Sequence, residues 1–126
     1  MPVKIVSEDG KNLTLQVTVD ISGSMLEAEE KIMAACNAVG TLTTEKALSQ
    51  FDTDGTPIKM GEKKYTAKAK ENKRYETPYG SACVQRYVYQ PSCGEGRTHV
   101  PFETSACIVH SATPKFTKML SHQYSS

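Results

Sequence analysis

The stretch Lys73-Arg74-Tyr75-Glu76-Thr77-Pro78-Tyr79-Gly80-Ser81-Ala82-Cys83-Val84-Gln85-Arg86-Tyr87-Val88-Tyr89 decides the fold class of this 126-residue chain. Two runs with β character, 73–77 and 82–89, flank a link that holds Pro and Gly where a tight turn prefers them. The pattern predicts a β-hairpin, and we expect its register to point the basic residues to one side.

Shorter runs of similar character precede and follow this hairpin. Those around 58–60 and 64–67 are separated by Gly or Pro turns, and they extend the hairpin into a small antiparallel sheet. The run 98–102 is a candidate edge strand, because Pro101 has no N–H to donate at a central position.

The first part of the chain predicts a second hairpin followed by helices. Apolar residues alternate over 13–19, which pairs with the run 4–6 across a polar turn. The stretch Ser24-Met25-Leu26-Glu27 has capping-box spacing and opens a run of helical periodicity, which Gly40 is expected to stop. A second short helix is expected over 44–51.

The chain is expected to close with a helix over 113–124. Thr113 is a candidate N-cap, and Pro114 suits the first helical position. One apolar stripe follows, made of Phe116, Met119, Leu120 and Tyr124. The elements together predict an α+β fold with an N-terminal hairpin, one or two helices, a small antiparallel sheet and a C-terminal helix.

Composition indicates one soluble α+β domain over 1–126, with 38% hydrophobic and 23% charged residues and a net charge of +1. With three Phe and no Trp, the core is expected to be aliphatic. The near-neutral total hides an acidic helical part, 1–56, with nine acidic and four basic residues. A basic β-rich part, 57–111, precedes the C-terminal helix, and residues 57–126 hold eleven basic and five acidic residues.

No stretch reaches the length of a membrane helix, and the N-terminus turns acidic where a signal peptide would continue apolar. We therefore expect a cytoplasmic protein without a membrane partner. Its four cysteines show no Cys-x-x-Cys spacing and are expected to be mostly buried thiols. A partial metal set at Cys93, His99 and Cys107 stays open, because its spacing is irregular.

No acid, base and nucleophile are arranged together in the sequence, so the chain is expected to be neither an enzyme nor dependent on a cofactor. The stretch Asp20-Ile21-Ser22-Gly23-Ser24 is similar to the cation-binding motif of von Willebrand A-type domains, which offers hard oxygen ligands at a helix N-terminus. A divalent-metal-dependent interaction module using Asp20, Ser22 and Ser24 is therefore an alternative function. We favour the interpretation that these residues end a strand and cap a helix, because the alternating α/β pattern of that fold is missing.

A dense basic segment with interleaved tyrosines predicts contacts with DNA phosphates. Its candidate DNA-binding residues are Lys63, Lys64, Lys68, Lys70, Lys73, Arg74 and Arg86. A lysine-lined edge strand that resists aggregation explains much of the same pattern. The sequence supports DNA binding and edge protection about equally.

Five short segments in one order carry a family resemblance. They are Phe51-Asp52-Thr53-Asp54-Gly55, Tyr75-Glu76-Thr77-Pro78-Tyr79-Gly80, Val84-Gln85-Arg86-Tyr87-Val88-Tyr89-Gln90, Pro101-Phe102-Glu103 and Ala112-Thr113-Pro114-Lys115-Phe116-Thr117-Lys118. In this order and spacing, the chain resembles the N-terminal region of Kra-type insertion-sequence transposases over about residues 24–126. The stretches 91–97 and 99–102 depart from that family's pattern.

The resemblance implies a role in DNA transposition. In that family, an RNase H-like domain with acidic residues and two metal ions follows the matched region. The chain is therefore expected to be the non-catalytic N-terminal part, or a truncated remnant, of such a transposase. Its expected partners are the DNA of a transposon end, further copies of itself, or the catalytic domain.

Overall fold

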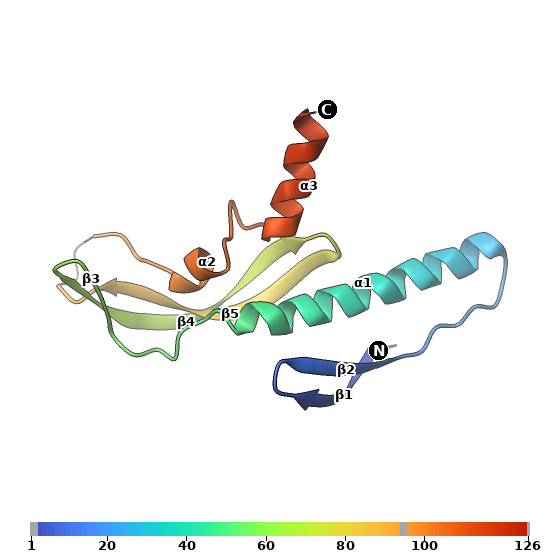
Figure 1. Ribbon diagram of the computed structural model, residues 1–126, viewed down its shortest axis with the longest axis horizontal. Coiled ribbons are helices and arrows are strands. Elements are labelled where there is room, and N and C mark those ends of the chain that lie inside the picture. Colours follow the sequence, from blue (N-terminus) through green and yellow to red (C-terminus); the bar gives the residue numbers. More distant parts are fainter. Residues whose placement is uncertain (1–2, 94–95, 126) are drawn as a thin grey trace.

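A computed structural model describes residues 3–93 and 96–125, including the backbone but not the side chains of 122–125. It has an α+β fold with two antiparallel sheets and three helices (Figure 1). The elements are β1 (Val3–Asp9), β2 (Asn12–Val17), α1 (Met25–Ser49), β3 (Ile58–Met60), β4 (Lys63–Thr77), β5 (Gly80–Pro91), α2 (Pro101–Ser105) and α3 (Pro114–Ser125). The predicted fold class is thus confirmed.

The β4–β5 hairpin is the longest paired unit of the fold, and it joins the separately predicted runs 64–67 and 73–77 into one strand. Its turn is closed by Thr77, whose Oγ1 donates to the Gly80 carbonyl oxygen at 2.7 Å and accepts from the Tyr79 N–H at 3.1 Å. Gly80 has φ +133°, which a residue with a Cβ rarely adopts. The predicted hairpin is confirmed and is longer than expected.

The register of the hairpin distributes the basic residues over both faces of the sheet. Cross-strand partners share a face, and Lys73 is paired with Val84 whereas its neighbour Arg74 is paired with Cys83. A β-bulge between Ala67 and Ala69 shifts the register again. The expectation that the basic residues point one way was wrong, because consecutive strand residues alternate between faces.

Helix α1 runs unbroken through Gly40, so the expected stop at Gly40 and separate helix over 44–51 were wrong. Ser24 caps the helix as predicted, and its Oγ accepts from the Glu27 N–H at 3.2 Å. Gly40 has a packing role instead, because the ring of Tyr79 lies where a Cβ on Gly40 would be. A glycine in the interior of a helix here allows close contact with the hairpin turn.

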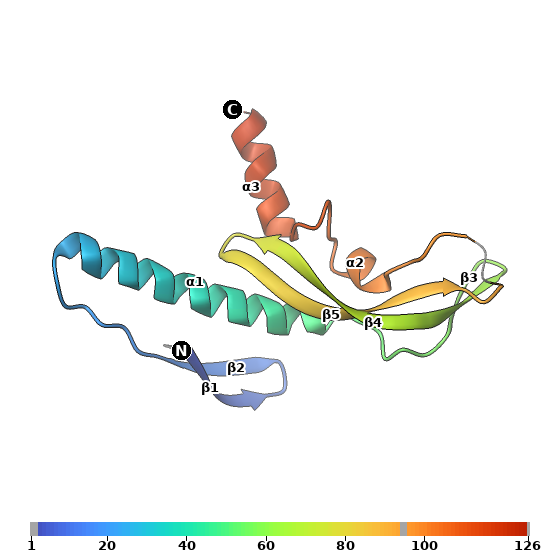
Figure 2. The ribbon, with the colours of Figure 1, turned by 180° about the vertical axis from the view of Figure 1, so that it is seen from behind.

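Carboxylates from α1 and the loop after it cover the free edge of β5. Glu45 accepts from the Cys83 N–H at 3.0 Å, and Asp52 accepts from the Tyr87 N–H at 3.2 Å. The first half of α1 extends beyond the three-stranded sheet, and the β1–β2 hairpin lies beside the middle and C-terminal part of the helix in both ribbon views (Figures 1 and 2). An ion pair between Lys46 and Glu8 at 3.3 Å joins the helix to β1.

The segment after β5 forms a short helix where an edge strand was expected over 98–102. His99 alone pairs with Tyr89, through backbone hydrogen bonds of 2.7 and 2.8 Å. Pro101 then stands at the start of α2, where its missing N–H is not needed. The strand prediction was therefore wrong beyond His99, and the basic β-rich part includes a helix.

The core lies between the hairpin, α1 and α2. It contains Leu48, Tyr75, Val84, Phe102 and Ala106. Most buried hydrophobic residues among those described are aliphatic, as expected, but the largest fully buried side chains are the aromatic residues Tyr75, Tyr89 and Phe102. Tyr75 and Phe102 are in ring contact, with centroids 5.6 Å apart.

Helix α3 is confirmed and projects away from the sheet (Figures 1 and 2). Its base is attached to the outer edge of β4, because the Glu76 N–H donates to the Ser111 carbonyl and the Thr113 N–H donates to the Glu76 carbonyl. Within the described part of the chain, the buried Thr113 Oγ1 has no hydrogen-bond partner, so it does not cap the helix. In the predicted stripe, Phe116 is half-buried and Met119 and Leu120 are exposed, whereas the Tyr124 side chain lies outside the described residues.

Among the described residues, none of the helices is both long and apolar enough to span a membrane.

Candidate functional site

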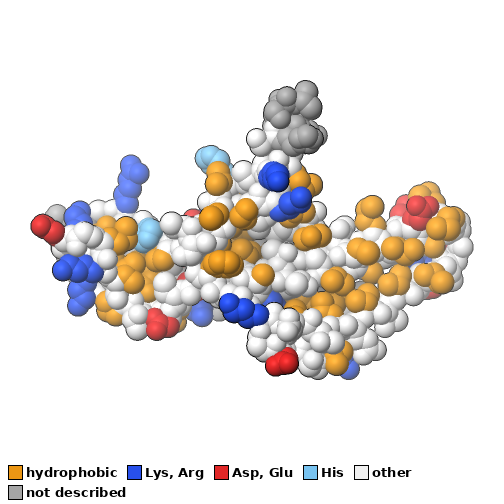
Figure 3. Space-filling view, viewed as in Figure 1, with side chains coloured by type: hydrophobic (Ala, Val, Ile, Leu, Met, Phe, Trp, Pro, Cys, Tyr) orange, Lys and Arg blue, Asp and Glu red, His pale blue; other side chains and the backbone are white. Residues whose placement is uncertain are grey.

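Strand β3 and the half of β4 nearer to it, up to the middle of β4 at Lys70, carry exposed lysines. We call this set the distal lysine cluster, and its members are Lys59, Lys63, Lys64, Lys68 and Lys70. Figure 3 shows Lys and Arg side chains at the end of the molecule that carries β3. No ion pair joins these five side chains to a carboxylate of the described chain, including Glu62 in the β3–β4 turn. The cluster therefore presents unneutralised positive charge to solvent.

Within this cluster, Lys59 of β3 stands directly opposite Lys64 of β4. Like charges at opposed positions of an antiparallel pair are destabilising. Lys70 contacts an aromatic face rather than an acid, with its Nζ 4.9 Å from the ring centroid of Tyr87. The opposed pair of lysines therefore costs stability locally, whereas the contact of Lys70 with Tyr87 is favourable.

The three remaining candidate DNA-binding residues lie toward the turn of the hairpin, and each is paired with an acid. Lys73 is 3.2 Å from Glu103, and Arg74 is 3.6 Å from Glu76. Arg86 is only 6% exposed. Its NH1 lies 3.8 Å from a Glu71 carboxylate oxygen and donates to the Glu71 carbonyl at 3.1 Å. We therefore leave Arg86 out of the candidate interface.

Arg86 belongs instead to a polar network inside the molecule. Its Nε donates to the Tyr75 hydroxyl oxygen at 2.8 Å, and the Tyr75 hydroxyl donates to Glu103 at 2.6 Å. Burial, and then the hydrogen bond to Glu103, raise the pKa of Tyr75 to about 12. Burial also raises the pKa of Glu103, but hydrogen bonds from Tyr75 and Lys73 outweigh it and hold that pKa below its usual value.

Sequence reasoning missed this network. Arg86 continues the run of inward-facing positions that includes Val84 and Val88, so the alternation along β5 is the signal that could have marked it as buried. Its partner Glu103 comes from α2, which the sequence did not predict.

The Asp20-Ile21-Ser22-Gly23-Ser24 stretch is engaged in local structure. Asp20 accepts from the Ser22 N–H at 2.9 Å and forms an ion pair with Lys31 at 3.2 Å. Hydrogen bonds from Ser22, together with Lys31, lower the pKa of Asp20 to about 2. The ammonium group of Lys31 also donates to the Ser22 carbonyl at 3.3 Å. These contacts and the Ser24 cap favour the capping interpretation over a cation site.

The cysteines differ from expectation, because Cys36, Cys83, Cys93 and Cys107 are all exposed. The described residues contain no group of three or more His, Cys, Asp or Glu side chains that could hold a metal ion. The open set of Cys93, His99 and Cys107 therefore does not come together as such a group. The ring of His99 packs edge-on against Tyr65, with centroids 6.3 Å apart.

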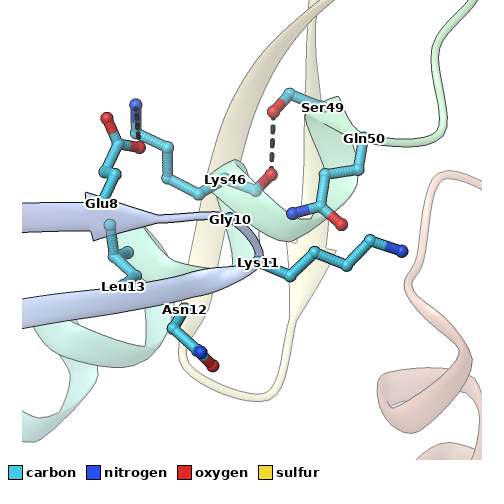
Figure 4. A pocket seen from close by; sticks show the side chains of 8 residues that line it. All are labelled: Glu8, Gly10, Lys11, Asn12, Leu13, Lys46, Ser49 and Gln50. Carbon is cyan, nitrogen blue, oxygen red and sulfur yellow. Dashed lines mark hydrogen bonds and ion pairs between the residues drawn. The ribbon is translucent and has the colours of Figure 1, made fainter.

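A shallow pocket lies where the turn of the β1–β2 hairpin meets the end of α1 (Figure 4). The ion pair between Lys46 and Glu8 lines it, and Ser49 Oγ donates to the Lys46 carbonyl at 2.8 Å. These polar groups satisfy one another, so we interpret the pocket as a structural contact between hairpin and helix. Its lining residues are Glu8, Gly10, Lys11, Asn12, Leu13, Lys46, Ser49 and Gln50.

Comparison of the chain with models of known protein families, with curated proteins and with solved structures finds no match.

Proposed function

We propose that this protein binds the phosphate backbone of DNA through the distal lysine cluster, as a non-catalytic contributor to DNA transposition. The observation that carries the DNA part is the set of five exposed lysines without acidic partners in the described chain, two of which stand opposite each other. The ordered segments that resemble Kra-type insertion-sequence transposases support transposition as the process. In that role the chain is the N-terminal part, or a remnant, of such a transposase and holds or assembles a transposon end.

The dimensions of β4 suit this role. From Lys63 to Lys70 an extended strand covers about 23 Å, since each residue rises about 3.3 Å. One DNA strand advances about 3.4 Å for each phosphate, so the cluster spans roughly seven steps. Contacts of this kind hold DNA in position and carry no sequence information.

Strand order argues against edge protection as the whole explanation for the lysines. β4 lies between β3 and β5. Lys64 is paired with Lys59 of β3, and its carbonyl accepts from the Ser92 N–H on the other side, whereas the pairing of Lys63 is with Met60 of β3. Lys64 therefore has no free edge to protect from pairing with another chain, and binding of an anionic partner explains it better.

The direct test is a titration of fluorescent duplex DNA at several salt concentrations. Lys59 and Lys64 share one face of the sheet and Lys63 lies on the other. A duplex bound to one face therefore neutralises two or three phosphates, which predicts a plot of log affinity against log salt with a slope of about −2 to −3. The double variant Lys63→Ala/Lys64→Ala removes one lysine from each face and should flatten that slope by about one. Lys4→Ala/Lys11→Ala removes the same charge from the β1–β2 hairpin and should leave the slope unchanged. Binding that is insensitive to salt, or equal losses in both variants, would contradict the proposed interface.

The transposition part has a separate test in the genomic DNA that surrounds the coding sequence. We expect an adjacent reading frame, continuous with this one or separate, that carries spaced Asp, Asp and Glu codons for an RNase H-like domain. Flanking DNA without any such frame in intact or decayed form would contradict transposition and leave the DNA-binding result standing.

A further inference from the structure

The outer edge of β4, on the side away from β5, is open over the middle of the strand. At one end of β4, residues 63–65 are paired with β3, and at the other end Glu76 is bonded to residues 111–113. Among the described residues, no backbone hydrogen bond reaches the outer edge between these two contacts. An edge without a partner presents N–H and C=O groups with which another chain can pair.

The hydrogen bonds of β5 show which residues of β4 point toward this open edge. In an antiparallel pair, the backbone groups of opposite residues either bond each other or both point away. The N–H groups of Cys83 and Tyr87 point away from β4, because carboxylates of α1 and its following loop accept them. Their cross-strand partners Arg74 and Lys70 therefore point away from β5, as does Asn72 between them. The open edge thus presents the backbone groups of three alternate residues.

The side chains along the open edge are mostly basic. The stretch 66–75 contains Lys68, Lys70, Lys73, Arg74 and one acidic residue, Glu71. Lys70 and Arg74 lie on one face of the sheet, on either side of Asn72. The Arg74 side chain is 70% exposed, and its 3.6 Å contact with Glu76 leaves it accessible. Because opposite charges on neighbouring strands stabilise a sheet, this edge favours a strand with acidic side chains at alternate positions.

We propose that the open edge of β4 binds an extended acidic segment of another protein, which adds a strand to the sheet. The backbone groups of Lys70, Asn72 and Arg74 pair with the added strand and supply affinity, and the basic side chains beside them select acidic residues. The open stretch between β3 and Glu76 accommodates a strand of up to about ten residues, within the usual range of strand lengths. The proposal does not depend on DNA binding.

A second copy of the chain does not fit this edge. Antiparallel pairing of two open edges would place residue 67 of one copy opposite residue 74 of the other, and residues 63–65 opposite 76–78. Strand β3 is paired with 63–65 on that same edge, so it would collide with β4 of the other copy. The β-bulge after Ala67 and the lysines add to this protection against self-pairing. A separate acidic strand meets neither obstacle.

Fluorescence anisotropy with a synthetic peptide tests the proposal. The probe is a labelled peptide of about eight residues in which Glu and Val alternate, so that its carboxylates share one face. Asn72→Pro should weaken binding at least tenfold, because proline has no N–H to donate to the added strand. The substituted N–H points away from β5, so the hydrogen bonds of the hairpin are retained. Asn72→Ala is the matched control, because it removes the same side chain but keeps the N–H, and it should bind as wild type does. Absence of binding to wild type, or equal binding by Asn72→Pro, overturns the proposal.

Amide hydrogen exchange of the wild-type chain locates the peptide without any substitution. At saturating peptide, the N–H groups of Lys70, Asn72 and Arg74 should exchange at least tenfold more slowly, because the added strand accepts hydrogen bonds from them. If the peptide binds and these exchange rates stay the same, surface charge alone holds it and strand addition is wrong.

Strand addition and DNA binding can fail separately. Asn72→Pro keeps every lysine, so it should leave the salt dependence of DNA binding unchanged. Lys63→Ala/Lys64→Ala lies outside the open stretch and should leave the slowed exchange at Asn72 intact. Loss of that slowed exchange in the lysine variant would contradict the placement of the added strand between β3 and Glu76.

Discussion

The two halves of the β4–β5 hairpin differ in whether their basic residues have acidic partners. In the half nearer the turn, Lys73, Arg74 and Arg86 each lie within 4 Å of a carboxylate oxygen. In the other half and in β3, the distal lysine cluster has no acidic partner among the described residues and includes a directly opposed pair of lysines. The basic residues of the hairpin are therefore divided between positions with an acidic partner and positions without one. Their neighbours in space, rather than their spacing along the chain, make the difference.

The largest effect should come from the core beside the turn. Phe102→Ala removes a fully buried ring that contacts Tyr75, and we expect a loss of about 3–5 kcal/mol in the free energy of unfolding. Urea denaturation measures it. Met60→Ala at the distal end is the comparison, because that side chain is exposed and its loss should change little. Similar losses in both variants would remove the distinction between the two ends.

Arg86→Ala should rank second, with a loss of about 2–3 kcal/mol, because charged hydrogen bonds to Tyr75 and to the Glu71 carbonyl are removed in a buried setting. Lys70→Ala also removes one positive charge from the hairpin but only from an exposed site, and it should cost less than about 1 kcal/mol. The same urea measurements compare the two. If Arg86→Ala proved as mild as Lys70→Ala, the network near the turn would not stabilise the fold.

Tyr75→Phe should cost about 1–2 kcal/mol at neutral pH, because it deletes the hydroxyl between Arg86 and Glu103. The pKa of Tyr75 is raised from 10.0 to about 12 in the folded chain, so its contribution to stability is complete below pH 10. As the pH rises from 10 to 12, the unfolded chain releases this proton first and the contribution is lost. The difference in unfolding free energy between wild type and variant should therefore shrink over that range. A constant difference would mean that the hydroxyl titrates as an ordinary tyrosine.

The smallest effect on stability is expected at the distal lysine cluster. Lys59→Ala should relieve repulsion from Lys64 and change the free energy of unfolding by no more than about 0.5 kcal/mol. Added salt should stabilise wild type more than the variant, because salt screens the repulsion between Lys59 and Lys64, which the variant lacks. Thermal melting at low and high salt checks this. A clear loss of stability would assign the cluster a structural role.

Local signals predicted the elements whose causes are local. The turn at 77–80, the Ser24 cap and the start of α3 at Pro114 each depend on residues within a few positions, and all three are confirmed. The role of Gly40 depends on Tyr79, which lies 39 positions later in the chain, so no window around the glycine could show that the helix continues.

The candidate site could be predicted only in part, because its ion pairs also depend on residues that are far apart in the sequence. An exposed lysine in a strand looks the same in sequence whether or not an acid comes near it. Glu103 reaches Lys73 from α2, and Glu71 reaches Arg86 through the register of the hairpin. The register and the placement of α2 give Arg86 and Lys73 their partners, whereas Arg74 is paired with Glu76 two residues further along the same strand.

The carboxylates that cover β5 also bear on how the protein resists fibril formation. The stretch Val84-Gln85-Arg86-Tyr87-Val88-Tyr89 is the most strand-prone of the chain, and an exposed edge there would offer a template for cross-β stacking. Glu45 and Asp52 occupy amide hydrogens along that edge with side chains. Each carboxylate accepts from one N–H of β5 and adds no strand that could pair further. A second strand at this edge would therefore find these N–H groups already hydrogen-bonded. Helix α1 and the loop after it thereby reduce the number of free backbone donors that a second strand could pair with along β5.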